Sequence, residues 1–156
     1  MPSKTELYVK TIPSGTVIDH ISGGNALNVL RILNISGKGD HVVSVVMNVP
    51  SGKFGRKDIV KIESRELSPD EVDKIALIAP KATINIIRDY DVVEKKKVKL
   101  PMVIKGIVRC DNPSCISNAK EPVDSMFHTE EVDPLKIRCH FCGRIMEMPD
   151  VLKQFQ

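Results

Sequence analysis

Four cysteines in the last third of the chain constrain its fold more than any other feature. Cys110 and Cys115 form a C-x4-C pair, Cys139 and Cys142 form a C-x2-C pair, and 23 residues separate the pairs. This spacing is typical of tetrahedral zinc, because each tight turn supplies two thiolates. Two disulfides are the alternative. We find no charged-then-apolar leader and no apolar run long enough to span a bilayer, so we expect a cytoplasmic chain, reduced thiols and one zinc ion.

The residues beside the cysteines favour tight turns. Gly143 directly follows the second pair, and glycine accepts the positive φ that a metal-binding turn requires. Residues 111–114, inside the first pair, are turn-forming by composition. His128 and His140 could also bind metal, but four thiolates already complete a tetrahedral shell, so we expect both to be exposed loop residues. Such a shell has no open position for water, which indicates a structural zinc site rather than a catalytic one.

Composition and charge narrow the possible partners. The chain has 156 residues, 42% of them hydrophobic but only 4% aromatic, so a core must rest on Ile, Val and Leu. Residues 1–100 carry 16 Lys and Arg against 12 Asp and Glu, whereas residues 101–156 carry 7 against 8. Zinc ribbons that bind nucleic acid normally have basic surfaces, because phosphate contacts dominate that affinity. The acidic balance of the cysteine-bearing part therefore favours a protein partner.

The first hundred residues alternate between strand and helix patterns and end near Pro101. Helical spacing predicts a helix at 26–33, and a second is expected from Ser68, where Pro69 and Glu71 complete a capping box. Strands are expected at residues 7–12, 41–49, 58–63 and 82–87, the last with a continuation at 90–93. The order β-α-β-β-α-β is that of the ferredoxin-like split βαβ fold, in which two helices cover one face of an antiparallel sheet.

Residues 101–156 are expected to form a small all-β zinc ribbon, so the whole chain belongs to the α+β class. Strands are expected at 102–109, 126–128, 136–138 and 144–148, around the four cysteines. A domain of this size is too small to fold without its metal.

No constellation of residues suggests catalysis. The chain has no Walker A, GxGxxG or HExxH sequence, and the cysteines are committed to metal. Asp19 and His20 are neighbours on an extended segment and point to opposite faces, so they do not form an acid–base dyad. Solvated surface charge is sufficient to explain Lys61 and the basic run at 95–97. The functional alternative is an anion site, in which Asp19 binds ribose hydroxyls and the lysines bind phosphates.

The segments that carry a family resemblance run in order through nearly the whole chain. They are GTVIDHI at 15–21, PSG at 50–52, GRKD at 55–58, KIE at 61–63, APKAT at 79–83, Asn85, Tyr90, VV at 92–93, Cys110, Asn112, CIS at 115–117, EPV at 121–123, and the Cys139/Cys142 pair. On these residues the chain resembles the regulatory chain of aspartate carbamoyltransferase. The combination of a split βαβ domain with a C-x4-C…C-x2-C ribbon indicates this family more specifically than either domain alone.

The resemblance implies a non-catalytic, allosteric subunit of a pyrimidine-biosynthetic enzyme. Residues 1–100 would bind nucleoside triphosphates and pair with a second regulatory chain as a homodimer. Residues 101–156 would dock on the catalytic chain. CTP is the expected inhibitor and ATP the expected activator, with UTP a further candidate; no membrane or nucleic-acid partner is implied.

The resemblance also implies individual effector-binding residues. Asp19 and Lys61 match ribose-contacting positions, while Lys95 and His20 match positions at the phosphates. The positions around base and sugar are Ile12, Asn85, Ile87, Tyr90 and Val92. Ser114 and Gly143 depart from the family pattern at the knuckles, so the resemblance does not fix the docking hydrogen bonds there.

Two other functions compete with a regulatory subunit. A nucleic-acid-binding zinc ribbon would need a basic, aromatic face, yet the only aromatics in residues 101–156 are Phe127, Phe141 and Phe155. A metalloenzyme or redox protein fits less well, since four thiolates close the zinc shell and rubredoxin-like iron sites use two C-x2-C pairs.

Overall fold

The structure, a computed structural model, describes residues 11–52, 55–119 and 123–155. The chain divides into two compact units, Met1–Val98 and Lys99–Gln156. In the described ranges, no helix has the length and apolar character needed to cross a membrane.

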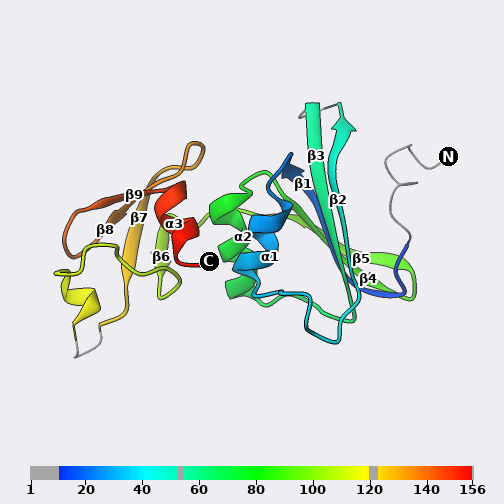
Figure 1. The fold of residues 1–156 in the computed structure, drawn as a ribbon, viewed down its shortest axis with the longest axis horizontal. Coiled ribbons are helices and arrows are strands. Elements are labelled where there is room, and N and C mark those ends of the chain that lie inside the picture. Colours follow the sequence, from blue (N-terminus) through cyan, green and yellow to red (C-terminus); the bar gives the residue numbers. More distant parts are fainter. Residues whose placement is uncertain (1–10, 53–54, 120–122, 156) are drawn as a thin grey trace. The chain divides into compact units, whose positions relative to one another are not determined.

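The first unit is an antiparallel sheet with two helices on one side (Figure 1). Its strands pair in the order β2-β3-β1-β4-β5, and the first four of these positions are those of the split βαβ fold. The elements in chain order are β1 (Ser14–Ser22), α1 (Ala26–Ile32), β2 (Val43–Ser51), β3 (Gly55–Glu63), α2 (Pro69–Ile78), β4 (Thr83–Arg88) and β5 (Asp91–Lys97). The expected α+β class is confirmed.

Two strand predictions in this unit need correction. Most of the strand expected at 7–12 lies outside the described residues, and Thr11 and Ile12 are not in a strand; the first strand is the β-branched segment that follows, β1. The segment expected to continue β4 is instead a separate strand, β5. Asp89 and Tyr90 take positive φ values of 51° and 65°, which turns the chain back on itself in a tight hairpin. The lysines at 95–97 therefore lie in an edge strand.

The helix-covered face of the sheet can be identified from burial and from Asp58. Ile18, Val60 and Ile84 lie side by side on β1, β3 and β4, and each is 0–1% exposed. Asp58, two residues before Val60 and thus on the same face, accepts a hydrogen bond from the backbone N–H of Ala26 (2.8 Å). This contact caps α1, whose N-cap Asn25 makes no side-chain cap bond.

Helix α2 begins as the sequence predicts. The backbone N–H of Glu71 donates to the Ser68 hydroxyl (3.3 Å), and the Ser68 N–H donates to the Glu71 carboxylate (3.1 Å), which completes the capping box. Ile75, Ala76, Leu77 and Ile78 are buried. The cap thus fixes where the helix starts, and the apolar residues fix its packing.

We expect Ser68→Ala to lower the free energy of unfolding of the first unit by about 1 kcal/mol, because the substitution removes the hydroxyl that accepts from Glu71. Urea denaturation followed by circular dichroism measures the change. Ser36→Ala, in the exposed loop after α1, is the matched control and should leave stability unchanged. Equal stability of the two variants would contradict a stabilising cap.

The second unit is a four-stranded antiparallel sheet in the order β6-β7-β8-β9. Its elements are β6 (Val103–Lys105), a 3-10 turn (Ile116–Asn118), β7 (Met126–Glu131), β8 (Lys136–Cys139), β9 (Ile145–Glu147) and α3 (Met148–Lys153). Its small core includes Phe127, Ile137 and Met146, each fully buried.

The sequence predicts only strands in this unit, and the structure differs from that prediction at both ends of the unit. The strand expected at 102–109 is only three residues long, because Gly106 takes a φ of 72° and turns the chain. The strand expected at 144–148 gives way to α3 at Met148. Pro149 stands in its first turn, and the Glu147 N–H donates to the Asp150 carboxylate (2.9 Å) in a capping box. The ribbon is therefore mostly β, with one short C-terminal helix.

Candidate functional sites: a four-cysteine centre and a polar sheet face

The four cysteines come together in the second unit. Their sulfurs all lie within 4.8 Å of one another, and among the described residues they form the cluster suited to a metal ion. The Sγ atoms of Cys110 and Cys142 are 3.6 Å apart, as are those of Cys115 and Cys139. Four sulfurs at the usual Zn–S distance of about 2.3 Å stand about 3.8 Å apart in a tetrahedron. The cluster therefore has the size of a zinc–thiolate shell.

Backbone hydrogen bonds shape the turn that carries the C-x2-C pair. The Gly143 N–H donates to the Cys139 carbonyl (3.0 Å), and the Cys139 N–H donates to the Arg144 carbonyl (2.9 Å). Gly143 takes a φ of 76°, as expected for the glycine that follows the second pair.

The turn of the C-x4-C pair is built differently. The Cys115 N–H donates to the Asn112 carbonyl (3.0 Å). The Asn118 side-chain amide donates to the carbonyls of Cys110 (2.9 Å) and Asn112 (2.8 Å). One amide thus ties the segment after Cys115 to the start of this loop.

The environment of the thiols makes metal binding sensitive to pH. Burial raises the pKa of the Cys110 thiol to about 12 and also raises the pKa of Cys139. The backbone N–H of Arg144 lowers the pKa of Cys142 to about 6. A metal ion that binds these sulfurs must displace the protons of Cys110 and Cys139, whose pKa values are raised, so its affinity falls as the pH falls.

The polar face of the first unit's sheet brings together most of the residues expected to bind effectors. Lys61 on β3 lies opposite Val17 on β1, Val17 lies opposite Asn85 on β4, and Asn85 lies opposite Lys95 on β5. Residues directly opposite in neighbouring strands point to the same face. This row is offset by one residue from the buried row of Ile18, so it lies on the face away from the helices.

The other expected residues extend this row along the strands. Asp19 follows Val17 by two residues on β1, and Ile87 follows Asn85 by two on β4. Val92 on β5 lies opposite Ile87. All three therefore share the face that carries Lys61 and Lys95.

An ion pair at one end of this face includes a residue that the sequence did not single out. The Lys57 ammonium is 2.9 Å from the Asp19 carboxylate. Asp19 also accepts from the His20 backbone N–H (2.6 Å), and His20 Nδ1 lies 3.0 Å from the Thr83 hydroxyl. Lys57 and Lys61 are four residues apart on β3, which is the spacing of side chains on one face of a strand. That spacing was the available signal for Lys57.

Tyr90 is hydrogen-bonded to the segment that leads into β1, directly after Ile12. The Tyr90 N–H donates to the carbonyl of Pro13 (3.0 Å), which joins the β4–β5 turn to the segment before β1. The Ile12 side chain is buried, whereas Tyr90 is 65% exposed. Ile12 can therefore offer a ligand only its backbone, while the Tyr90 ring is accessible.

Models of two families match consecutive parts of the chain. Residues 7–99 match the allosteric domain of the aspartate carbamoyltransferase regulatory chain, and residues 102–152 match the metal-binding domain of the same chain. The chain belongs to this family. Proteins with that name are 56% identical in Methanocella arvoryzae (94% of this chain, 95% of the relative) and 62% identical in Methanothrix thermoacetophila (89% and 90%). One from Pyrococcus abyssi is 56% identical over 94% of this chain and 97% of its own length.

Membership of this family decides between a regulatory subunit and the competing functions. The chain is a regulatory chain of aspartate carbamoyltransferase, with an allosteric domain and a metal-binding domain, and it is not the catalytic chain. The nucleic-acid-binding alternative is not favoured. The metal-binding match and the four-cysteine cluster agree with one zinc ion per chain.

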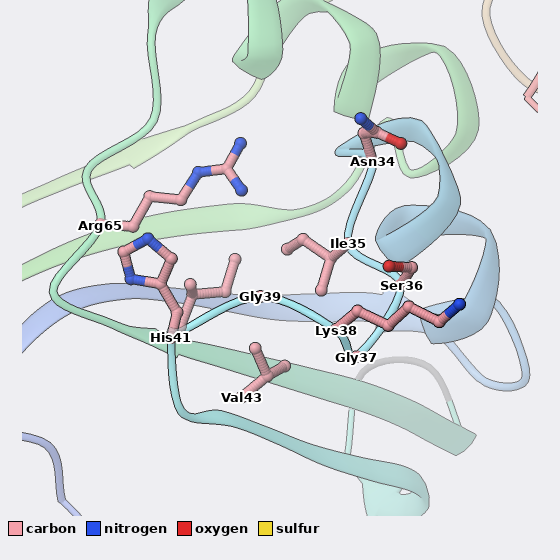
Figure 2. Close-up of a pocket in the computed structure, with 10 residues that line it drawn as sticks. Asn34, Ile35, Ser36, Gly37, Lys38, Gly39, His41, Val43 and Arg65 are labelled. Carbon is pink, nitrogen blue, oxygen red and sulfur yellow. The ribbon is translucent and has the colours of Figure 1, made fainter.

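A separate hollow of about 270 Å³ lies beside the loop after α1 (Figure 2). Ile35 and Val43 line its length, with Arg65 and His41 at one end and Lys38 at the other. None of the residues expected to bind effectors lines it. The hollow and the polar sheet face are therefore different surfaces of this regulatory chain.

Proposed function

We propose that the polar sheet face binds nucleoside triphosphates of the CTP and ATP type, with UTP a further candidate. The observation that carries the proposal is the row of Lys61, Asn85 and Lys95 on the sheet face turned away from the helices, where Lys61 and Asn85 are half-buried and Lys95 is exposed. The Lys95 ammonium suits a phosphate of the ligand, because hydrogen bonds between charged partners are about twice as strong as neutral ones. Asp19, two residues along β1 from Val17 of this row, suits ribose hydroxyls as an acceptor, and Lys61 suits them as a donor. Ile12, His20, Ile87, Tyr90 and Val92 complete the proposed site.

We propose that Cys110, Cys115, Cys139 and Cys142 hold the zinc ion. Support comes from their sulfur separations and from the lack of any other cysteine in the sequence. Four thiolates complete the shell, so the zinc stabilises the fold and takes no part in a reaction. The proposed setting is the cytoplasm, where thiols stay reduced.

We propose that residues 1–100 form the effector domain and that residues 101–156 dock on the catalytic chain. The second domain is close to neutral, with 7 basic and 8 acidic residues, which suits a protein surface better than nucleic acid. The signal from a bound nucleotide would reach the catalytic chain through this second domain.

We propose that a second regulatory chain pairs with the first domain, and β2 is the edge of the sheet that suits it. Its neighbour in the chain, Val42, and its own Val45 and Met47 are large apolar residues that are at least 36% exposed. The opposite edge, β5, also exposes Val92 and Val93, but it carries Asp91, Glu94 and three lysines. Charged side chains protect an edge from pairing, whereas an apolar edge invites it.

Titration calorimetry of the zinc-loaded chain with CTP and with ATP tests the effector proposal. We expect both to bind, and we expect Lys61→Ala and Lys95→Ala each to weaken binding about tenfold or more, because each removes a charge-assisted contact. The loss of affinity in Lys95→Ala should be seen with the nucleoside triphosphate and not with the diphosphate. The loss of affinity in Lys61→Ala should be seen with both nucleotides.

Lys96→Ala is the matched control. Lys96 lies on the same edge strand but pairs with Ile84, a residue of the helix-covered face, so its side chain points away from the proposed site. It should leave nucleotide affinity nearly unchanged. Equal losses in all three variants would indicate a general effect of positive charge, and no binding at millimolar nucleotide would exclude the site.

A further inference from the structure

Two histidines meet on the surface of the second unit, outside the four-cysteine cluster. His128 lies on β7, and His140 lies in the turn between Cys139 and Cys142. The Nε2 atom of His128 is 2.9 Å from the Nδ1 atom of His140. Their ring centroids are 5.1 Å apart, and both residues are exposed. Two imidazole nitrogens thus hydrogen-bond to each other on a surface that solvent ions can reach.

The backbone holds this pair in place. Phe127 and Cys139, the residues just before each histidine, are opposite each other in the β7–β8 ladder, and both are 0–1% exposed. The His140 N–H also donates to the Met126 carbonyl (2.8 Å). The Phe141 ring lies edge-on to the His140 ring, with centroids 5.2 Å apart. The two histidines are therefore neighbours because of the sheet itself.

We propose that His128 and His140 form a second metal site, which takes a transition-metal ion such as Ni²⁺ or Cu²⁺. Imidazole nitrogen is a preferred ligand for these ions. At a metal–nitrogen distance of about 2.05 Å, two ligands at a right angle stand about 2.9 Å apart, whereas tetrahedral ligands stand about 3.4 Å apart. The 2.9 Å separation is that of a hydrogen bond between the two rings, and it is also compatible with the right-angled geometry of square-planar or octahedral ions. It differs from that of the tetrahedral thiolate site.

The surroundings are compatible with a cation. Arg138 lies directly opposite His128 in the ladder, but its guanidinium is held by the Glu130 carboxylate (2.5 Å), which offsets its charge. The four cysteine sulfurs cluster separately, and neither histidine belongs to that group. Binding breaks the hydrogen bond between the rings: the donor imidazole moves its proton to its other ring nitrogen, and both rings turn so that their lone pairs point to a shared ion. Water or a partner's side chain would fill the remaining positions.

Calorimetry with nickel chloride tests the second site in the full, zinc-loaded chain. We expect one Ni²⁺ to bind per chain while elemental analysis shows the zinc retained. His128→Asn and His140→Asn should each weaken nickel binding at least tenfold. His41→Asn is the matched control, because His41 is an exposed histidine of the first unit whose Nδ1 lies 2.9 Å from the Glu63 carbonyl; it should leave nickel binding unchanged.

Three results would overturn the proposal: no saturable nickel binding, full binding in His128→Asn, or release of one zinc for each nickel taken up. The last would mean that nickel enters the thiolate site. His128 lies outside the turn between the zinc-binding cysteines, so its variant remains decisive even if His140→Asn loses zinc. None of these measurements involves nucleotide binding, so the test is independent of the proposed effector site.

Discussion

Replacing Cys139 by serine is expected to unfold the second unit and to abolish its zinc binding. The unit spans residues 99–156 and has few large buried side chains, so its apolar core alone supplies little stability. Structural zinc contributes about 10 kcal/mol or more to folding in small domains, which is comparable to the whole stability of a typical domain. Cys139 is itself 1% exposed, next to the core residue Ile137 on β8.

Zinc content and amide-proton dispersion in NMR spectra measure this outcome. We expect signals of the first unit to stay dispersed while those of residues 99–156 collapse. Ser117→Ala is the matched control: the Ser117 hydroxyl lies 3.1 Å from the Cys115 sulfur but is no proposed ligand, so this variant should keep its zinc and its fold. A folded, zinc-loaded Cys139→Ser protein would show that the cluster does not carry the stability of this unit.

Local chemistry decided which elements the sequence could predict. Helix α2 was predictable because Ser68, Pro69 and Glu71 specify its first turn before any tertiary contact forms. The cysteine cluster was predictable because spacing alone puts two thiolates in each turn. Helix α3 was missed because its six residues are too few to show a helical period.

Features that depend on strand register could not be predicted. The hairpin at Asp89 and Tyr90 carries no glycine, although both residues take positive φ, so the usual turn signal is absent. The Lys57–Asp19 pair joins residues 38 apart and needs the β1–β3 register to be known. The His128–His140 contact arises in the same way from the β7–β8 register. Sequence patterns supplied the residue types at these places, and pairing of the strands supplied the contacts.

Removing zinc is expected to separate the two proposed activities of the chain. A chelator that strips the four-cysteine site should abolish association with the catalytic chain, because the proposed docking surface belongs to the unit that is expected to unfold without metal. Binding of CTP and ATP should remain nearly intact. The first unit has its own buried core of Ile, Val and Leu, and no group of metal-binding side chains occurs among its described residues.

Gel filtration of the zinc-free chain with the catalytic chain measures association, and calorimetry of the same sample measures nucleotide binding. Restored zinc should restore the complex, which controls for damage by the chelator. A complex that survives without metal would show that docking does not run through residues 101–156. Loss of nucleotide binding along with docking would show that the two units do not fold independently. Only the combination of lost docking and retained nucleotide affinity agrees with an effector domain and a docking domain whose boundary in the sequence lies near Pro101.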